Sequence, residues 1–428
     1  MRAGAAAVVL LLWYGAPRPA LASPWDTFGV GTRAVGLSGA MASVVDDWTA
    51  VYYNPAGLTR SENSSLGAGY FSVSHDLEIN GQREPVSALA GPFLGASMKL
   101  GERMAFGISA MIPGSVVKLK ILSPDKRNFV MYDNRTQRLE LMGAGSLKLA
   151  DMLSVGVGFK FLADAPFETG MLIRLPPTKG GEPQYSDFDV YMEITPKMSP
   201  VAGIMLTPTE NLGFGLTFRE EIFMDFDILI YARIEFAGFP IDMPLKVRGK
   251  IYHTPRQIVG STSYRLSENL LAAVDLTWTQ WSKWEDPRGN VTVLETEGPP
   301  SPVGVPIFKD YPRPQFDDTI VPRLGLEWSL FEATRVRAGY RFEKSPAPEQ
   351  SGELNLVDND KHVVALGGSV DLGGDGSFLQ GIATIGAFAE YELLTDRTHT
   401  KSSADDPVGS YTSGGNVFQW GLDLVLRF

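Results

Sequence analysis

The feature that most constrains the fold is a period-two alternation of large apolar residues with small or polar ones. In the final segment, from Trp420 to Phe428, every second residue is large and apolar. Successive side chains of a β-strand point to opposite faces, so such a segment has one apolar and one largely polar face. A soluble sandwich and an outer-membrane barrel both use strands of this kind.

The connections between the strands decide between these two folds. They alternate strictly along the chain: six short turns of three to seven residues separate seven long polar loops of 11 to 36 residues. A sandwich has no reason to sort its loops by length, whereas an outer-membrane barrel has short periplasmic turns and long extracellular loops. We therefore predict an all-β, 14-stranded antiparallel transmembrane β-barrel with strands at 65–74, 86–99, 104–117, 138–149, 153–162, 190–206, 212–222, 256–266, 270–282, 319–330, 334–343, 362–372, 380–395 and 416–428.

The N-terminus and the composition agree with export. An apolar run from Ala5 to Tyr14 is followed by prolines and by Ala20-Leu21-Ala22, which predicts a signal peptide at 1–22. The chain has no Cys, which excludes disulfides, a thiolate metal site and a Cys nucleophile. Its net charge of −11 argues against nucleic acid as a partner. No later stretch is long and apolar enough for a transmembrane helix, so strands would carry the chain into the outer membrane.

Residues 23–64 do not alternate and precede the first predicted strand. They are rich in small residues but also contain large apolar ones such as Trp48, Tyr52 and Tyr53. A segment of about 40 residues suits a small helical plug, or hatch, inside the barrel lumen. A disordered periplasmic tail is the alternative, and the apolar content argues against it. The predicted domains are therefore the signal peptide at 1–22, the hatch at 23–64 and the barrel at 65–428.

The hatch segment resembles the N-terminal hatch of the FadL/TodX family of outer-membrane transporters. The residues that carry this resemblance are Gly31–Ala40, Asp46-Asp47 and Asn54-Pro55-Ala56. Weaker similarity continues through Trp278–Lys283, Arg337–Pro346 and Asp358–His362. The resemblance implies a hatch-plugged 14-stranded barrel that transports long-chain fatty acids or hydrocarbons across the outer membrane of a Gram-negative bacterium. We interpret the Asn54-Pro55-Ala56 turn as structural, since the Asn side chain can both donate and accept hydrogen bonds and Pro rigidifies a turn.

Two regions are candidate ligand sites under this interpretation. Family members bind ligand beside the hatch N-terminus, where Trp25 and Phe28 lie here; wedging of the hatch against the wall is the alternative for both. Arg33, Arg323, Arg337 and Arg341 could bind a fatty-acid carboxylate or could simply form ion pairs.

The second candidate site is the loop at 223–255, which is very apolar. This composition suits either a ligand-capturing surface or two strand extensions. The candidate residues are Phe223, Phe226, Ile230, Phe236 and Phe239.

The third predicted strand contains Pro113-Gly114, which predicts a kink or bulge. In the family such a kink is thought to release ligand sideways into the bilayer. The alternative is that the pair only ends the membrane-spanning part of the strand.

The sequence offers no enzymatic motif. The four histidines lack metal-ligand spacing, and neither a nucleophile elbow nor a phosphate loop is present. We expect no enzyme activity, no metal and no cofactor.

Expected partners are a hydrophobic small molecule, outer-membrane lipid, lipopolysaccharide and, through the strand ending at Phe428, the barrel assembly machinery. The barrel is expected to be a monomer. The alternative function is a passive porin or a structural surface barrel for polar solutes.

Overall fold

The computed structural model describes residues 25–86, 88–112, 127–132, 140–162, 167–174, 185–192, 197–236, 239–284, 290–293, 314–352, 355–372, 382–403, 406 and 408–428. The predicted signal peptide and the predicted kink at Pro113-Gly114 lie outside these residues. No helix in this part of the chain has both the length and the apolar character needed to cross a membrane.

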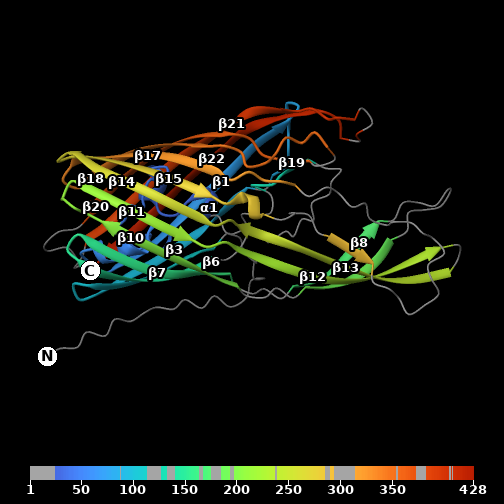
Figure 1. The fold of residues 1–428 in the computed structure, drawn as a ribbon, viewed down its shortest axis with the longest axis horizontal. Coiled ribbons are helices and arrows are strands. Elements are labelled where there is room, and N and C mark those ends of the chain that lie inside the picture. Colours follow the sequence, from blue (N-terminus) through green and yellow to red (C-terminus); the bar gives the residue numbers. More distant parts are fainter. Residues whose placement is uncertain are drawn as a thin grey trace.

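The fold is a closed β-barrel (Figure 1). Its fourteen strands are β1 (Ser65–Ile79), β3 (Leu89–Leu100), β4 (Met104–Met111), β6 (Glu140–Ala150), β7 (Leu153–Leu162), β10 (Lys197–Leu206), β11 (Leu212–Arg219), β14 (Gln257–Ser267), β15 (Leu270–Thr279), β17 (Thr319–Phe331), β18 (Thr334–Glu343), β20 (Lys361–Leu372), β21 (Ile382–His399) and β22 (Tyr411–Arg427). Each strand pairs antiparallel with its neighbours in chain order. The first strand closes the ring because Ser65 pairs with Arg427 of β22 on one side and with Ser97 of β3 on the other. The predicted fold class is confirmed.

Alternation along the strands gives the barrel two unlike faces. On β22, Trp420, Leu422 and Leu424 point outward and are 40%, 52% and 43% exposed, while Gly421 and Asp423 between them are buried. The outward residues form the apolar surface that lipid covers, and the inward ones line the lumen. Some strands continue past their predicted ends: β1 continues to Ile79 and β21 to His399.

A second sheet lies beyond the barrel at the end that carries the long loops (Figure 1). It is formed by β8 (Phe167–Arg174), β9 (Tyr185–Met192), β12 (Ile222–Phe236), β13 (Phe239–Thr254) and β16 (Asn290–Val293), in the order β16-β13-β12-β9-β8. The apolar loop at 223–255 is therefore a long hairpin that extends two barrel strands, one of the two arrangements expected for it. The short strand β2 (Gln82–Arg83) adds to β1.

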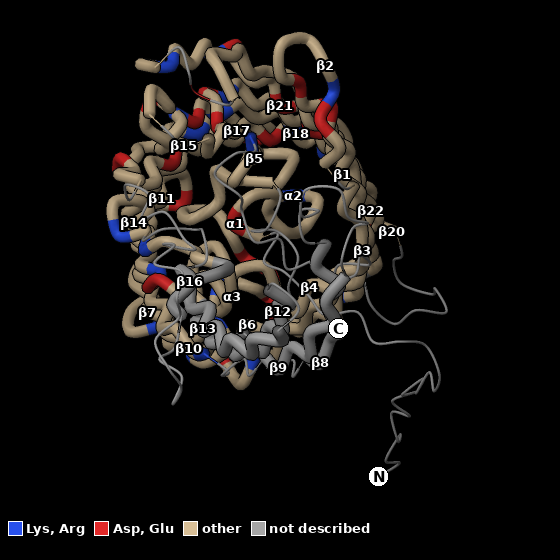
Figure 2. The backbone as a smooth tube through the Cα atoms, turned by 90° about the vertical axis from the view of Figure 1, so that its right-hand side faces the viewer, with Lys and Arg blue, Asp and Glu red and all other residues tan. Residues whose placement is uncertain are grey.

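The hatch lies inside the ring of strands (Figure 2). It contains α1 (Trp25–Phe28), α2 (Thr32–Gly36), α3 (Ala50–Tyr53) and the 3-10 helix η1 (Pro55–Arg60). Lumen-facing glycines let its backbone and side chains approach the wall, because a Cβ at these positions would lie 3.0 Å or less from a hatch atom. They lie on nine strands: Gly67, Gly95, Gly107, Gly156, Gly203, Gly215, Gly325, Gly339 and Gly386. The hatch is thus fitted to the wall around much of the barrel.

A second inward-folded segment was not predicted. Residues 128–132 belong to a long loop, yet all five are buried, and β5 (Asn128–Phe129) pairs in parallel with β19 (Leu356–Val357). The Tyr132 hydroxyl donates a 2.9 Å hydrogen bond to Glu392 on the lumen wall. The Tyr132 ring also contacts His75, whose ring in turn lies 6.2 Å from that of Phe28 in the hatch. This segment packs above the hatch N-terminus.

Candidate ligand-binding site

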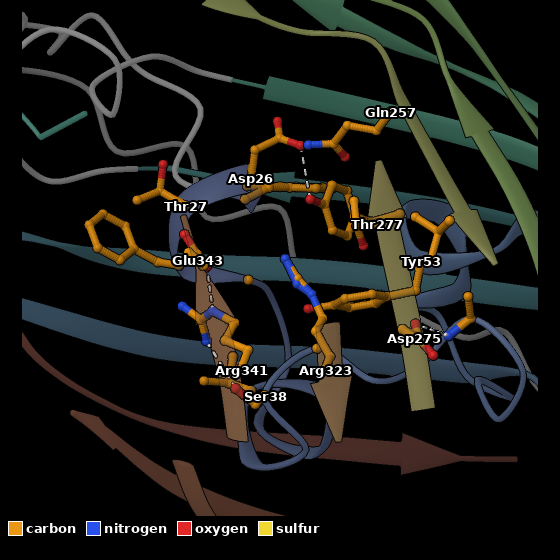
Figure 3. A pocket seen from close by; sticks show the side chains of 18 of the residues that line it. Asp26, Thr27, Ser38, Tyr53, Gln257, Asp275, Thr277, Arg323, Arg341 and Glu343 are labelled. Carbon is orange, nitrogen blue, oxygen red and sulfur yellow. Dashed lines mark hydrogen bonds and ion pairs between the residues drawn. The ribbon is translucent and has the colours of Figure 1, made fainter. Parts of the chain in front are cut away.

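A pocket of about 560 Å³, continuous with solvent, separates the hatch N-terminus from the barrel wall (Figure 3). One side is formed by α1 and by Tyr52 and Tyr53 of α3. The other side is formed by inward-facing residues of β11, β14, β15, β17, β18 and β21. That volume includes space that is open to solvent.

Trp25 and Phe28 both line this pocket, and their contact with a ligand stays a prediction. Each is only 1% exposed. The Trp25 ring packs edge-on against Tyr52 at 5.6 Å, and the Phe28 carbonyl accepts a 3.0 Å hydrogen bond from the Gln419 side chain on β22. The Phe28 carbonyl thus ties α1 to the wall, the Trp25 ring ties it to the rest of the hatch, and both residues line the pocket.

The turn after α1 depends on glycine. Gly29 and Gly31 have φ of 70° and 82°, a left-handed region that glycine adopts without steric cost. Between them, the Val30 amide donates to the Tyr53 hydroxyl at 3.1 Å. Burial raises the pKa of Tyr53 to about 12, so this hydroxyl stays protonated well above physiological pH. The turn and the hydroxyl together position α1 over the pocket.

Asn54 fixes the hatch to the wall on another side. Its side chain is fully buried and donates to the carbonyls of Ala42, at 2.7 Å, and Ile204, at 3.1 Å. Its Oδ1 accepts from the Ala56 amide at 3.2 Å, which caps η1, and Pro55 occupies the first position of that helix. Because Ile204 belongs to β10, this one side chain links two parts of the hatch to the barrel.

The acidic pair of the hatch has structural partners. Asp46 forms a 2.7 Å ion pair with Arg33. Asp47 accepts from the Thr49 amide and hydroxyl at 2.8 and 2.5 Å, which closes the turn before α3. Burial, with Asp46 nearby, raises the pKa of Asp47 above its usual value. Neither carboxylate lines the pocket.

Of the four arginines considered for ligand binding, two lie outside the pocket lining and share one carboxylate. Arg33 contacts Glu327 of β17 at 2.9 and 3.0 Å, and Arg337 of β18 contacts the same carboxylate at 2.6 Å. Arg341 does line the pocket, but it forms ion pairs with Glu343, Glu390 and Glu392 at 2.6, 2.6 and 3.3 Å. Only Arg323 lines the pocket without a hydrogen bond or ion pair to any residue in the described part of the chain.

Sequence analysis missed several polar residues of the pocket. Arg219 donates to Gln257 at 2.9 Å and to the Tyr52 carbonyl at 3.0 Å, and lies over the Tyr52 ring. Asp26 accepts from the Tyr52 hydroxyl at 3.0 Å and from the buried amine of Lys160 at 3.4 Å. The alternation of β7 and β11 does place Lys160 and Arg219 on the inner face. Nothing in the sequence says which hatch residue each one meets.

Phe223, the one residue of the predicted capture surface whose side chain is described, does not line the pocket. Phe223 stacks on His253 with ring centroids 6.2 Å apart, at the base of the β12–β13 hairpin. The Trp284 ring also stacks on His253, with centroids 5.9 Å apart. The side chains of Phe226, Ile230, Phe236 and Phe239 fall outside the described part of the structure. The structure therefore places one of these five residues in an aromatic stack and leaves the capture role as a proposal.

A closed barrel of this kind, with an apolar outer face, a folded plug and an internal pocket at the plug, defines an outer-membrane transport protein. The sequence matches the family described as outer membrane protein transport protein (OMPP1/FadL/TodX) over residues 26–384. The chain belongs to this family.

The chain is similar to known proteins along most of its length. It is 23% identical to alkane uptake protein A of Marinobacter nauticus over 94% of this chain and 90% of that protein. It is 21% identical to a long-chain fatty acid transport protein of Salmonella typhi, over 84% and 85% of the two chains. Among solved structures, a Pseudomonas aeruginosa FadL homologue matches with a TM-score of 0.63 at 16% identity, covering 93% of this chain and 98% of the other. The Pseudomonas putida toluene transporter TodX matches with a TM-score of 0.58 at 14% identity, over 94% and 99%.

Proposed function

We propose that this outer-membrane protein takes up long-chain hydrophobic compounds, fatty acids or hydrocarbons, through the pocket between α1 and the barrel wall. The observation that carries the proposal is the position of Trp25 and Phe28: both are held at the hatch N-terminus and both line that pocket. An apolar solute meets a lipopolysaccharide-coated surface that resists it, and it needs apolar surface along its route. The named activities of the relatives, alkane uptake and fatty acid transport, support the same substrate range.

The proposed route has three stages. The β12–β13 hairpin captures the compound outside, the pocket at α1 receives it, and a displacement of α1 lets it leave. Exit is sideways into the bilayer near Pro113-Gly114, close to the described end of β4 at Met111. Lateral exit spares the compound a passage through water in the periplasm.

The remaining parts of the proposal concern partners and chemistry. Phe428 directly follows β22 and is 72% exposed, which suits recognition by the barrel assembly machinery. The outer end of the barrel contacts lipopolysaccharide, and the protein acts as a monomer. It performs no chemical reaction on its ligand. The family assignment lends no support to the alternative of a porin for polar solutes.

Uptake by cells tests the proposal. Cells that lack their own hydrophobic transporter express the full chain and receive labelled oleate, hexadecane, toluene or a disaccharide. We expect uptake of at least one apolar compound. Deletion of residues 23–28 and the double substitution Pro113→Ala/Gly114→Ala should each reduce it at equal surface expression. Uptake of the disaccharide alone, unchanged in both variants, would contradict the proposal and indicate a porin.

A further inference from the structure

One ammonium group inside the barrel lies between two carboxylates. Lys160 of β7 has a fully buried side chain, and its Nζ lies 3.4 Å from Oδ2 of Asp26 and 3.9 Å from Oε1 of Glu140. The side chains of both acids are buried as well. Asp26 belongs to α1 of the hatch (Figure 3), whereas Glu140 belongs to β6 of the wall. This ammonium therefore connects the hatch N-terminus to the barrel.

The two acids differ in what else binds them. Oδ1 of Asp26 accepts a 3.0 Å hydrogen bond from the Tyr52 hydroxyl, so this carboxylate is also held within the hatch. The Glu140 carboxylate accepts no hydrogen bond from any residue in the described part of the chain. A buried carboxylate without hydrogen bonds is unfavourable, and this one keeps its full capacity to accept them. Glu140 is thus an incompletely used partner for the ammonium while α1 is docked, as it is in this structure.

The strand register lets Lys160 reach either acid. Glu140 and Lys160 are diagonal neighbours on the inner face, since Met142, two residues after Glu140, pairs with Lys160. Diagonal positions lie about 7–8 Å apart, within reach of long side chains. A lysine carries its charge on a flexible four-carbon stem with three rotatable donors. Closing the remaining distance to Glu140 therefore needs only rotations about that stem and no movement of the wall.

Glu140 also lies on the side of the barrel where exit is proposed. It is the first residue of β6 and pairs with Met111, the last residue of β4. Pro113-Gly114 follows two residues after Met111 in the sequence. One lysine side chain thus joins α1 to the strand that borders the proposed exit.

We infer that Lys160 is a transferable latch: it holds Asp26 while α1 is docked and passes to Glu140 when α1 leaves. The inference rests on the proposed function, because it concerns the displacement of α1 that lets a compound through. Breaking a buried ion pair by removing one partner is strongly unfavourable, since it leaves an uncompensated charge. With Glu140 beside it, Lys160 keeps a partner after Asp26 has gone. Glu140 is therefore a positioning residue that lowers the free energy of opening.

Thiol labelling measures the opening of α1 without any ligand. The chain has no cysteine, so Thr27→Cys supplies a single reporter on α1, and its rate of labelling follows the population in which α1 is undocked. In this background the variants are Asp26→Asn, Glu140→Gln and the two together, each a full chain purified in non-ionic detergent. Neither single substitution leaves Lys160 without an acid in the docked state. Retained heat-modifiable migration on gels shows that each variant is a folded barrel.

The two single substitutions should act in opposite directions. Asp26→Asn should speed labelling roughly ten-fold or more, because α1 then leaves without breaking an ion pair. Glu140→Gln should slow it by a similar factor, because Lys160 then has no partner once α1 has left. When Asp26 is already replaced, Glu140→Gln should have no further effect, which is the signature of a shared partner in a double-mutant cycle.

The matched control is Asp371→Asn. It removes a lumen-facing carboxylate that pairs with Arg335 at 2.6 Å, within the wall, and it should leave labelling unchanged. Faster labelling in both single variants would show two ordinary structural ion pairs and would overturn the latch. An unchanged rate in Glu140→Gln would overturn it as well. Both results leave the transport function intact, because uptake of oleate, hexadecane or toluene by cells tests that function separately.

Discussion

Replacing Asn54 with alanine should loosen the hatch while leaving the barrel closed. The side chain makes three hydrogen bonds, of 2.7, 3.1 and 3.2 Å, and is fully buried. At about 1 kcal/mol net for each bond, the substitution weakens hatch docking by about 3 kcal/mol. That free energy corresponds to a roughly 150-fold larger population of the undocked hatch. The carbonyls of Ala42 and Ile204 also lose a donor, which acts in the same direction.

Amide hydrogen exchange measures this effect directly. In the Asn54→Ala variant, the amides of residues 50–60 should exchange roughly 100-fold faster, because exchange there follows local opening. The barrel strands should keep the protection they have in wild type. Asn211→Ala, on an exposed short turn, is the matched control and should change neither region. Wild-type exchange rates at residues 50–60 in the Asn54→Ala variant would refute the idea that this side chain holds the hatch.

Three further predictions concern the lumen and the hatch. Glu327→Gln removes the carboxylate shared by two arginines, so it should lower the free energy of unfolding by about 3–5 kcal/mol and with it the unfolding temperature. Its control, Glu332→Gln, changes an exposed side chain and should have no effect. Gly215→Val should displace the hatch and raise ion conductance in planar bilayers, whereas Gly260→Val, where a Cβ meets nothing within 4 Å, should leave conductance unchanged. Because burial raises the pKa of Tyr53 to about 12, its hydroxyl should stay protonated until the pH approaches 12; the ultraviolet titration of tyrosinate should lose a group near pH 12 in Tyr53→Phe.

The barrel could be predicted because its strands and turns are specified by residues that are close together in the sequence. Alternation identifies each strand, and the strict sequence of short and long connections identifies the closed up-and-down topology. The ends of the strands were harder to predict. Beyond the membrane the lipid no longer requires an apolar face, so the continuation of β21 to His399 left no clear pattern. The inward position of residues 128–132 was missed because a loop's path depends on what it packs against.

The pocket was only partly predictable for a related reason. Alternation indicates that Arg323, Arg337 and Arg341 point into the lumen, yet it does not say which of them is paired. Their partners lie on other strands and in the hatch; Arg33, for example, meets Glu327 almost 300 positions away in the sequence. Such pairings follow from barrel closure and from the docked hatch, which no local pattern specifies. The resemblance located Trp25 and Phe28 at the hatch N-terminus, and the structure adds the charged wall opposite them.

Photo-cross-linking of an apolar ligand tests the central claim most directly. The full chain in lipid vesicles is irradiated with a diazirine-bearing long-chain fatty acid, and labelled peptides are identified by mass spectrometry. The account predicts labelling of peptides that contain Trp25–Phe28 and the lumen-facing Val259, competed by unlabelled ligand. Labelling confined to outward residues such as Leu422, and unaffected by competitor, would show that the compound only dissolves in the lipid around the barrel and would contradict the account.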